Sequence, residues 1–148
     1  KAFLPRSNCL LISWQQSLFA VILERGMYSE GETEHEVVNS IDRLKPVLEY
    51  VESHFSQNLS LDQLAGVIGM NAKYFCRFFS QTTQQTPMNY VNRYRVEQAA
   101  HMLCGGDLSV TEVGMECGFT DTSHFVKTFK KHKGVTPKQF RLREGKSK

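Results

Sequence analysis

The stretch SVTEVGMECGF at residues 109–119 decides the fold, because it repeats the pattern of SLDQLAGVIGM at residues 60–70. The polar, apolar and glycine positions of the two stretches correspond at a shift of 49 residues. Farther along, residues 75–90 correspond to residues 125–140 at a shift of 50, which preserves the phenylalanine spacing and a Thr-Pro pair. A period of this length indicates a duplicated supersecondary unit.

Both copies carry the signals that begin and end a short helix. Ser60-x-x-Gln63 and Ser109-x-x-Glu112 are capping boxes, in which each side chain satisfies a free backbone N–H. A glycine then marks the end of the helix, and a second cap follows within a few residues. These later positions are Gly69 and Asn71 in the first copy, and Gly118 and Asp121 in the second. The sequence therefore predicts a helix, a tight turn and a second helix, twice.

The helical spacing identifies equivalent core positions in the two copies. Cys117 corresponds to Ile68, which predicts a buried thiol with no chemical role. Ala65 and Gly114 share a position where a small residue lets a second helix approach closely. Glycine lowers helix propensity by about 1 kcal/mol relative to alanine, so we expect close packing at Gly114. The aromatic side chains predicted to face inward are those of Phe75, Phe78, Phe79, Phe125 and Phe129.

Positive charge is concentrated toward the C-terminal end of the chain. The 148 residues carry 18 Lys and Arg against 15 Asp and Glu, a net charge of +3. Residues 44–148 account for +5 and residues 122–148 for +8, whereas residues 1–43 carry −2. This asymmetry favours a polyanionic partner, although a solvated lysine-rich tail would give the same charge.

The inward phenylalanines leave one outward face on the second helix of each copy. Arg77 and Lys127 hold the same position there, and a cation suits the O6 and N7 acceptors of guanine or a phosphate. Side chains in the first turn of such a helix enter the major groove. The candidate DNA contacts on these faces are Lys73, Arg77, Thr122, Ser123 and Lys127, and Cys76 also points outward. These faces could instead be merely solvated, but two copies with matched cations favour DNA.

Further basic side chains follow the second helix of the second copy. They offer no base-reading geometry, so we predict phosphate contacts whose affinity falls with salt. They are Lys130, Lys131, Lys133, Lys138, Arg141 and Arg143. Tyr74 and His124 share a position beside the inward phenylalanines. Each could donate to a phosphate or fill a half-buried seam, and the seam is the interpretation we favour.

A long helix is predicted between the two copies. Thr86 is its expected cap, Pro87 fits its first turn, and the helix runs to about Cys104. At 1.5 Å per residue it spans roughly 27 Å. With the width of the flanking units added, the two outward faces are expected about one DNA turn apart, ~34 Å.

No motif in the chain indicates catalysis, a metal or a cofactor. The four cysteines form no Cys-x-x-Cys pair, which favours free thiols in a reducing cytoplasm. His101-x-x-Cys104 lacks the second ligand pair that zinc needs. No nucleophile–base arrangement or glycine-rich phosphate loop is present. The apolar run at residues 9–23 is shorter than the ~20 residues that span a bilayer, so we expect no membrane partner.

Three parts of the sequence together carry a family resemblance. They read R-x-x-x-A-x-x-M-L at 95–103, V-G-x-x-x-G-F-x-D-x-S-H-F-x-K-x-F-K at 113–130 and G-V-T-P-x-x-F-R at 134–141. This spaced pattern closely resembles the C-terminal signature of AraC/XylS-type transcription regulators, and the resemblance covers about residues 44–143.

The resemblance implies seven helices with two helix-turn-helix units that bind promoter DNA, most often in an activator. RNA polymerase is a further candidate partner. By position, the resemblance places the family's base contacts on Lys73, Cys76 and Arg77 in the first unit, and on Thr122, Ser123 and Lys127 in the second. The chain departs from the family at Gly114, where alanine is usual, and at Gln84, where a glycine usually ends the first recognition helix.

The N-terminal region resembles helices that lead from a sensor domain into the DNA-binding domain, and it could pair two copies into a homodimer. Thr33-x-x-Glu36 fits a capping box there. Pro46 is expected in the first turn of a helix whose apolar face extends from Leu44 to Phe55. The expected divisions are a helical arm at 1–41 and a DNA-binding domain at 42–148, with helix-turn-helix units at about 60–84 and 109–133 and a linker helix at about 87–104.

The sequence thus predicts an all-α fold in which a linker helix joins two helix-turn-helix subdomains, preceded by a helical arm. The predicted function is that of a cytoplasmic bacterial transcription regulator that reads two adjacent major-groove segments of double-stranded promoter DNA. The alternative is a basic helical module that binds an acidic protein without reading bases. Salt-dependent binding to duplex DNA distinguishes the two.

Overall fold

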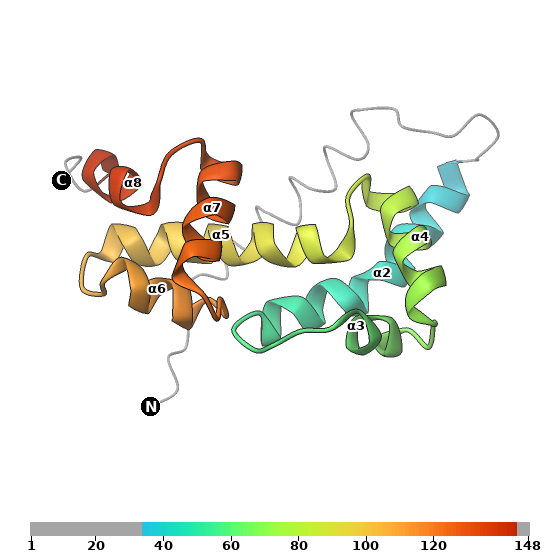
Figure 1. Ribbon diagram of the computed structural model, residues 1–148. Coiled ribbons are helices and arrows are strands. Elements are labelled where there is room, and N and C mark those ends of the chain that lie inside the picture. The colour runs from blue at the N-terminus through green and yellow to red at the C-terminus, as the bar shows by residue number, and fades with distance from the viewer. Residues whose placement is uncertain (1–33, 145–148) are drawn as a thin grey trace. The chain divides into compact units, whose positions relative to one another are not determined.

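The computed structural model describes residues 34–144 as a succession of helices (Figure 1). They are α2 (Glu34–His54), α3 (Leu61–Val67), α4 (Ala72–Thr83), α5 (Pro87–Gly105), α6 (Val110–Glu116), α7 (Thr122–Lys133) and α8 (Pro137–Glu144). No strand occurs within 34–144, and the all-α prediction is confirmed. The expected arm lies outside the described residues up to position 33, the expected cap Thr33 included. Of the two compact units of the chain, 1–40 and 41–148, the second contains both copies of the repeat.

The first of these helices corrects the interpretation of Pro46. We predicted Pro46 in a first helical turn, but α2 continues through it from Glu34 to His54. Proline provides no N–H for the carbonyl of Asp42, one turn earlier. Both residues are exposed, so water can satisfy that carbonyl. The side chains of Val47 and Val51 are fully buried and hold the helix in the core.

Both capping boxes predicted within the repeat are formed. The hydroxyl of Ser60 accepts from the N–H of Gln63 at 3.2 Å, and the Gln63 side chain accepts from the N–H of Ser60 at 2.9 Å. Ser109 and Glu112 repeat the arrangement, at 3.2 and 2.7 Å. These bonds satisfy N–H groups that lack partners inside a helix, which is why both copies begin where the sequence indicated.

The second helices of the two copies end differently. Both α4 and α7 close with a residue in the left-handed region, Gln84 with φ of 58° and Gly134 with φ of 77°. Within 34–144, Gln84 is the only residue other than glycine with a positive φ. A side chain in this conformation costs roughly 1–2 kcal/mol, so the first copy ends with a strained turn that the second avoids.

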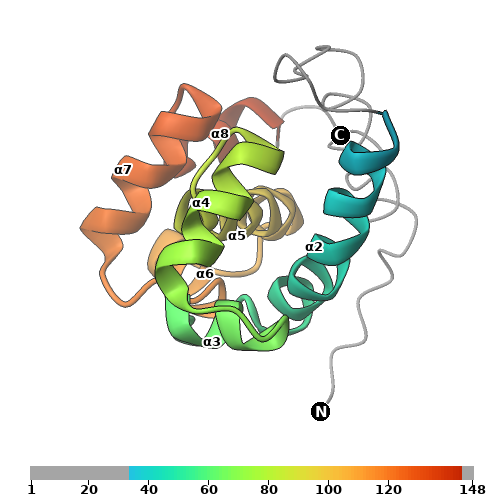
Figure 2. The same cartoon turned by 90° about the vertical axis from the view of Figure 1, so that its right-hand side faces the viewer.

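Helix α5 connects the two copies and packs against both (Figure 1). Thr86 caps it by accepting from the N–H of Asn89 at 3.3 Å, Pro87 fills the first position, and Gly106 ends it. Helix α4 packs near its start, whereas α6, α7 and α8 pack farther along. Viewed along α5, α7 lies on one side of the fold and α2 on the other (Figure 2).

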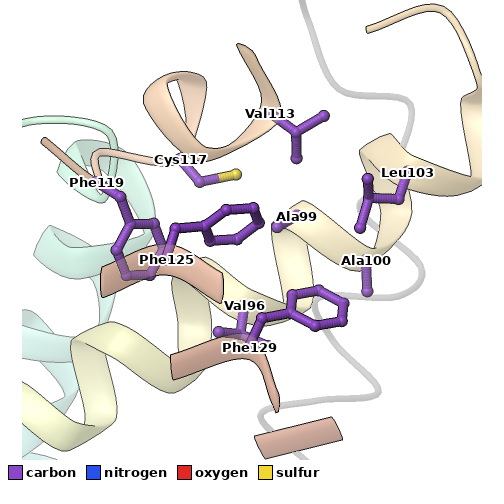
Figure 3. Close-up of a cluster of buried hydrophobic side chains, with 9 residues drawn as sticks. All are labelled: Val96, Ala99, Ala100, Leu103, Val113, Cys117, Phe119, Phe125 and Phe129. Carbon is purple, nitrogen blue, oxygen red and sulfur yellow. The ribbon is translucent and has the colours of Figure 1, made fainter. Parts of the chain in front are cut away.

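A phenylalanine-rich core fills the second copy (Figure 3). It consists of Val96, Ala99, Ala100, Leu103, Val113, Cys117, Phe119, Phe125 and Phe129, all buried. Cys117 is fully buried, as its correspondence to Ile68 predicted, and this burial raises its thiol pKa to about 12. Gly114 lies against Phe125, so the expectation of close packing there is also confirmed.

Arg95 makes a contact that the sequence did not predict. This residue of α5 is only 7% exposed. Its Nε donates to the carbonyl of Phe55 at 2.8 Å, and its Nη2 donates to the carbonyl of Gln57 at 2.7 Å. The guanidinium also lies over the ring of Phe119, 5.7 Å from the centroid. One buried cation therefore joins the loop after α2 to the turn between α6 and α7.

Candidate nucleic-acid interface

Helix α4 presents the candidate residues of the first copy. The side chain of Asn71 caps the helix by accepting from the N–H of Tyr74 at 2.9 Å. Phe75 and Phe79 are buried, and they fix which face of the helix points inward. On the outward face Lys73 and Arg77 are exposed, one helical turn apart, while Cys76 between them is half-buried. The structure therefore brings the three predicted residues together on one face.

Helix α7 presents the candidates of the second copy in the same way. Both carboxylate oxygens of Asp121 are used as caps, accepting from the N–H groups of Ser123 at 3.0 Å and His124 at 3.2 Å. Its inward phenylalanines, equivalent to those of α4, are fully buried. Ser123 and Lys127 are exposed, one turn apart, and Thr122 is half-buried. The pairs Lys73/Arg77 and Ser123/Lys127 thus occupy corresponding faces.

The basic side chains at the end of α7 divide into two groups. Lys130 and Lys131 are exposed, and within residues 34–144 neither side chain forms an ion pair or a hydrogen bond. Lys133, however, donates to a carboxylate oxygen of Glu97 on α5 at 2.6 Å. The guanidinium of Arg141 donates to the carbonyl of Leu108. Lys133 therefore connects the end of α7 to α5, and Arg141 connects α8 to the loop before α6, while the phosphate contacts expected of both stay a prediction.

The two aromatic positions beside the inward phenylalanines also differ from expectation. The side chain of Tyr74 is 52% exposed, so it does not fill a half-buried seam. His124 is exposed as well, but its ring meets Phe119 edge-on at 5.6 Å. The sequence indicated only that the two residues share a slot. Tyr74 therefore joins the outward face of the first copy as a hydroxyl donor, and the half-buried seam that we favoured for it is wrong.

The side chain of His132 adds little positive charge to this surface at neutral pH. His132, near the end of α7, is half-buried, and burial followed by the charge of Lys131 lowers its pKa below the ordinary value. Within 34–144, no three or more His, Cys, Asp or Glu side chains gather where they could hold a metal ion. None of the described helices is long and apolar enough to cross a membrane.

Known proteins provide an independent comparison. The family model described as "Helix-turn-helix domain" matches residues 64–143. The HTH-type transcriptional activator RhaS of Enterobacter sp. (strain 638) is 32% identical over 121 residues, which cover 82% of this chain and 42% of RhaS. The chain therefore spans about two fifths of the length of this curated relative.

Two solved structures share the arrangement of helices. A transcriptional regulator from Chromobacterium violaceum, described as containing an AraC-type DNA-binding domain, is 25% identical with a TM-score of 0.67, covering 75% of this chain and 99% of that one. The DNA-binding domain of AdpA, solved in complex with a target DNA, is 27% identical with a TM-score of 0.67, covering 71% of this chain and 95% of that one.

Proposed function

We propose a function from one premise, which is that this chain belongs to the AraC-type helix-turn-helix family. The chain is part of a cytoplasmic bacterial transcription regulator, an activator, that binds double-stranded promoter DNA. Its recognition helices, α4 and α7, enter two adjacent major-groove segments on one side of the duplex. The observation that carries this proposal is the pair of matched outward faces on α4 and α7. Each helix has an N-terminal cap, buries phenylalanines on its inward face and presents an exposed cation on its outward face.

Both faces carry side chains for base contacts and side chains for phosphate contacts. Arg77 and Lys127 lie far enough into their helices to reach guanine edges, with Lys73, Thr122 and Ser123 in the first turns and Cys76 beside them. Lys130, Lys131 and the hydroxyl of Tyr74 contact the phosphate backbone, which positions the helices without reading sequence. Because the outward residues of α4 and α7 differ, the preferred site is asymmetric.

The test begins with selection of bound sequences from random duplexes by the whole chain. The expected result is two dissimilar half-sites separated by about one helical turn. With the selected duplex, Arg77→Ala should weaken binding by about 1–3 kcal/mol and relax preference at one base position. Lys131→Ala should weaken binding to all sequences and lower the salt slope by about one.

Lys45→Ala is the matched control, because Lys45 is an exposed cation on α2, across the fold from α7 (Figure 2). It should leave affinity, base preference and salt slope unchanged. Selection that yields no consensus, with equal losses for all three variants, would support the alternative of a basic module that reads no bases.

Two further partners follow from the same proposal. An activator raises transcription by RNA polymerase, so that enzyme is a candidate partner once the chain is on DNA. Residues 1–40 are the candidate contact for a homodimer. Deleting residues 1–30 should reduce self-association in sedimentation while binding to the selected duplex persists. Unchanged self-association would remove the dimer contact from this region.

A further inference from the structure

The loop between α2 and α3 is held in one conformation from several sides. The N–H of Gln57 donates to the carbonyl of His54 at 2.9 Å, which forms a tight turn. The ring of Phe55 meets that of Tyr94 on α5 edge-on at 5.4 Å. The two carbonyls that point toward α5, those of Phe55 and Gln57, both accept from the buried guanidinium of Arg95. The loop is therefore anchored to the linker helix.

The second copy packs closely against this anchored loop. Gly118 lies in the turn between α6 and α7, and a Cβ added to it would stand 2.6 Å from the carbonyl oxygen of Phe55 and 3.0 Å from the carbonyl of Ser56. Both atoms belong to backbone, which cannot turn away as a flexible side chain can. Next to Gly118, the ring of Phe119 lies under the guanidinium of Arg95. Arg95 and Gly118 thus meet the same loop from two directions.

The first copy lacks this contact. Gly69 occupies the same place in its own turn, with φ of 67° against 85° for Gly118, yet a Cβ added to Gly69 would meet nothing within 4 Å. Both glycines satisfy the left-handed turn, but only Gly118 also permits close approach to another segment. Both glycines therefore serve their own turn, but of the two only Gly118 also contacts the loop after α2.

This asymmetry has a consequence for the recognition helices. The anchored loop leads directly into α3 and α4, whereas the turn at Gly118 leads directly into α7. Apart from this contact, α5 is the helix that packs against elements of both copies. With this contact, the loop that leads into the first copy and the turn of the second copy are in close backbone contact, beside the buried Arg95.

We propose that Arg95 and Gly118 are positioning residues, which fix the separation and orientation of α4 and α7 so that the chain accepts only one spacing of half-sites. This inference rests on the proposed function, because spacing matters only for a protein that binds two grooves at once. A rigid pair of helices gains the full benefit of linked binding at the matching spacing and loses it elsewhere. A loosened pair tolerates other spacings.

The experiment compares the selected duplex with one that has a single base pair inserted between its half-sites. The insertion moves one half-site by about 3.4 Å and turns it by roughly 34°. For the unaltered chain, we expect the insertion to weaken binding at least about tenfold. For Gly118→Ala and for Arg95→Met, which removes the donors but keeps the long side chain, the loss should fall to about threefold or less. Each variant is compared with itself on the two duplexes, so a uniform loss of affinity cancels.

Two control variants make the comparison specific. Gly69→Ala introduces the same left-handed strain without touching another segment, and it should keep the full insertion penalty. Arg95→Lys keeps a buried cation with one donor direction, and it should recover part of the penalty lost in Arg95→Met. Equal penalties in the unaltered chain, Gly118→Ala and Arg95→Met would overturn the proposal.

A measurement without DNA separates this inference from the proposed function. Spin labels at Gln81→Cys on α4 and Lys130→Cys on α7, both exposed, report the distance between the recognition helices. Cys9, Cys76 and Cys104 are replaced by serine in this background, while the buried Cys117 stays.

The distance distribution should be narrow in the parent and in Gly69→Ala, and broader or shifted in Gly118→Ala and Arg95→Met. The same distribution in all four proteins would refute the positioning role of Arg95 and Gly118, even if the chain binds its DNA site. A broadened distribution in the variants of a chain that selects no DNA site would instead support the positioning role and contradict the proposed function.

Discussion

Replacing Gly114 with alanine tests the closest packing in the second copy. Gly114 lies in α6, and a Cβ added there would stand 2.8 Å from Cδ1 and 3.0 Å from Cγ of Phe125. The Phe125 ring is fully buried, and the rings of Phe119 and Phe129 lie 5.1 and 5.7 Å from it. It therefore has no room to retreat, and the added methyl group must push α6 away from α7.

Two opposing effects set the size of the change. Alanine improves helix propensity over glycine by about 1 kcal/mol. Overpacking a well-filled core costs about 1–3 kcal/mol, so Gly114→Ala should lower the free energy of unfolding by up to about 2 kcal/mol. Gly66 in α3 is a matched control, because a Cβ there would meet nothing within 4 Å. Gly66→Ala should raise the free energy of unfolding by up to about 1 kcal/mol.

Urea unfolding followed by circular dichroism measures both variants against the parent chain. The difference between them isolates the clash, since the propensity gain is common to both, and it should be about 1–3 kcal/mol in favour of Gly66→Ala. Equal stabilisation by the two substitutions would refute the reasoning, because it would mean that α6 and α7 accept a methyl group between them without displacement.

Three further predictions concern the ends of the recognition helices and the buried thiol. Gln84→Gly should raise the free energy of unfolding by about 0.5–1 kcal/mol by removing left-handed strain, even though the bond from the Gln84 side chain to the carbonyl of Gln81 is lost; an unchanged urea midpoint would contradict this. Asp121→Ala should lower it by about 1–2 kcal/mol, more than Asn71→Ala, because Asp121 caps two N–H groups and Asn71 one; the same urea series compares them, and equal losses would count against the argument. Burial raises the pKa of Cys117 from 9.0 to about 12, so the unfolded chain releases this thiol proton first. The free energy of unfolding should therefore fall as pH rises from about 9 toward 12, whereas below pH 9 the thiol is protonated in both states and causes no pH dependence. Cys117→Ala should flatten that decline; an equally steep decline would exclude the thiol as a cause.

Local features of the fold were predictable from the sequence. Capping boxes such as Ser60-x-x-Gln63 act within four residues, so their spacing alone identifies them. The inward direction of Phe75 and Phe79 follows from helical periodicity, and with it the outward direction of Lys73 and Arg77. For this reason the sequence alone predicts that the candidate residues share common faces.

Contacts between distant parts of the chain could not be predicted in this way. The partners of Arg95 are two backbone carbonyls. Every residue has such a carbonyl, so residue identity does not indicate which ones accept a hydrogen bond. The pairing of Lys133 with Glu97 joins positions 36 residues apart, with no motif to mark it. Pro46 was misplaced for a related reason, because the buried face of α2 outweighs the local preference of proline for a first turn.

The contact between Arg95 and the loop after α2 also bears on how the fold comes apart. In a fold made of sequential helices, most contacts are between neighbours, and one half can open while the other stays closed. Here the second copy packs against α5, and Arg95 of α5 bonds the loop that leads into α3 and also lies over Phe119 of the second copy, so an opening at this junction disturbs both halves. We expect amide hydrogens in α3 and α6 to exchange through a single opening event with a common free energy, and two distinct values would argue against it. A protein assembled from a repeated half should then unfold as one cooperative unit.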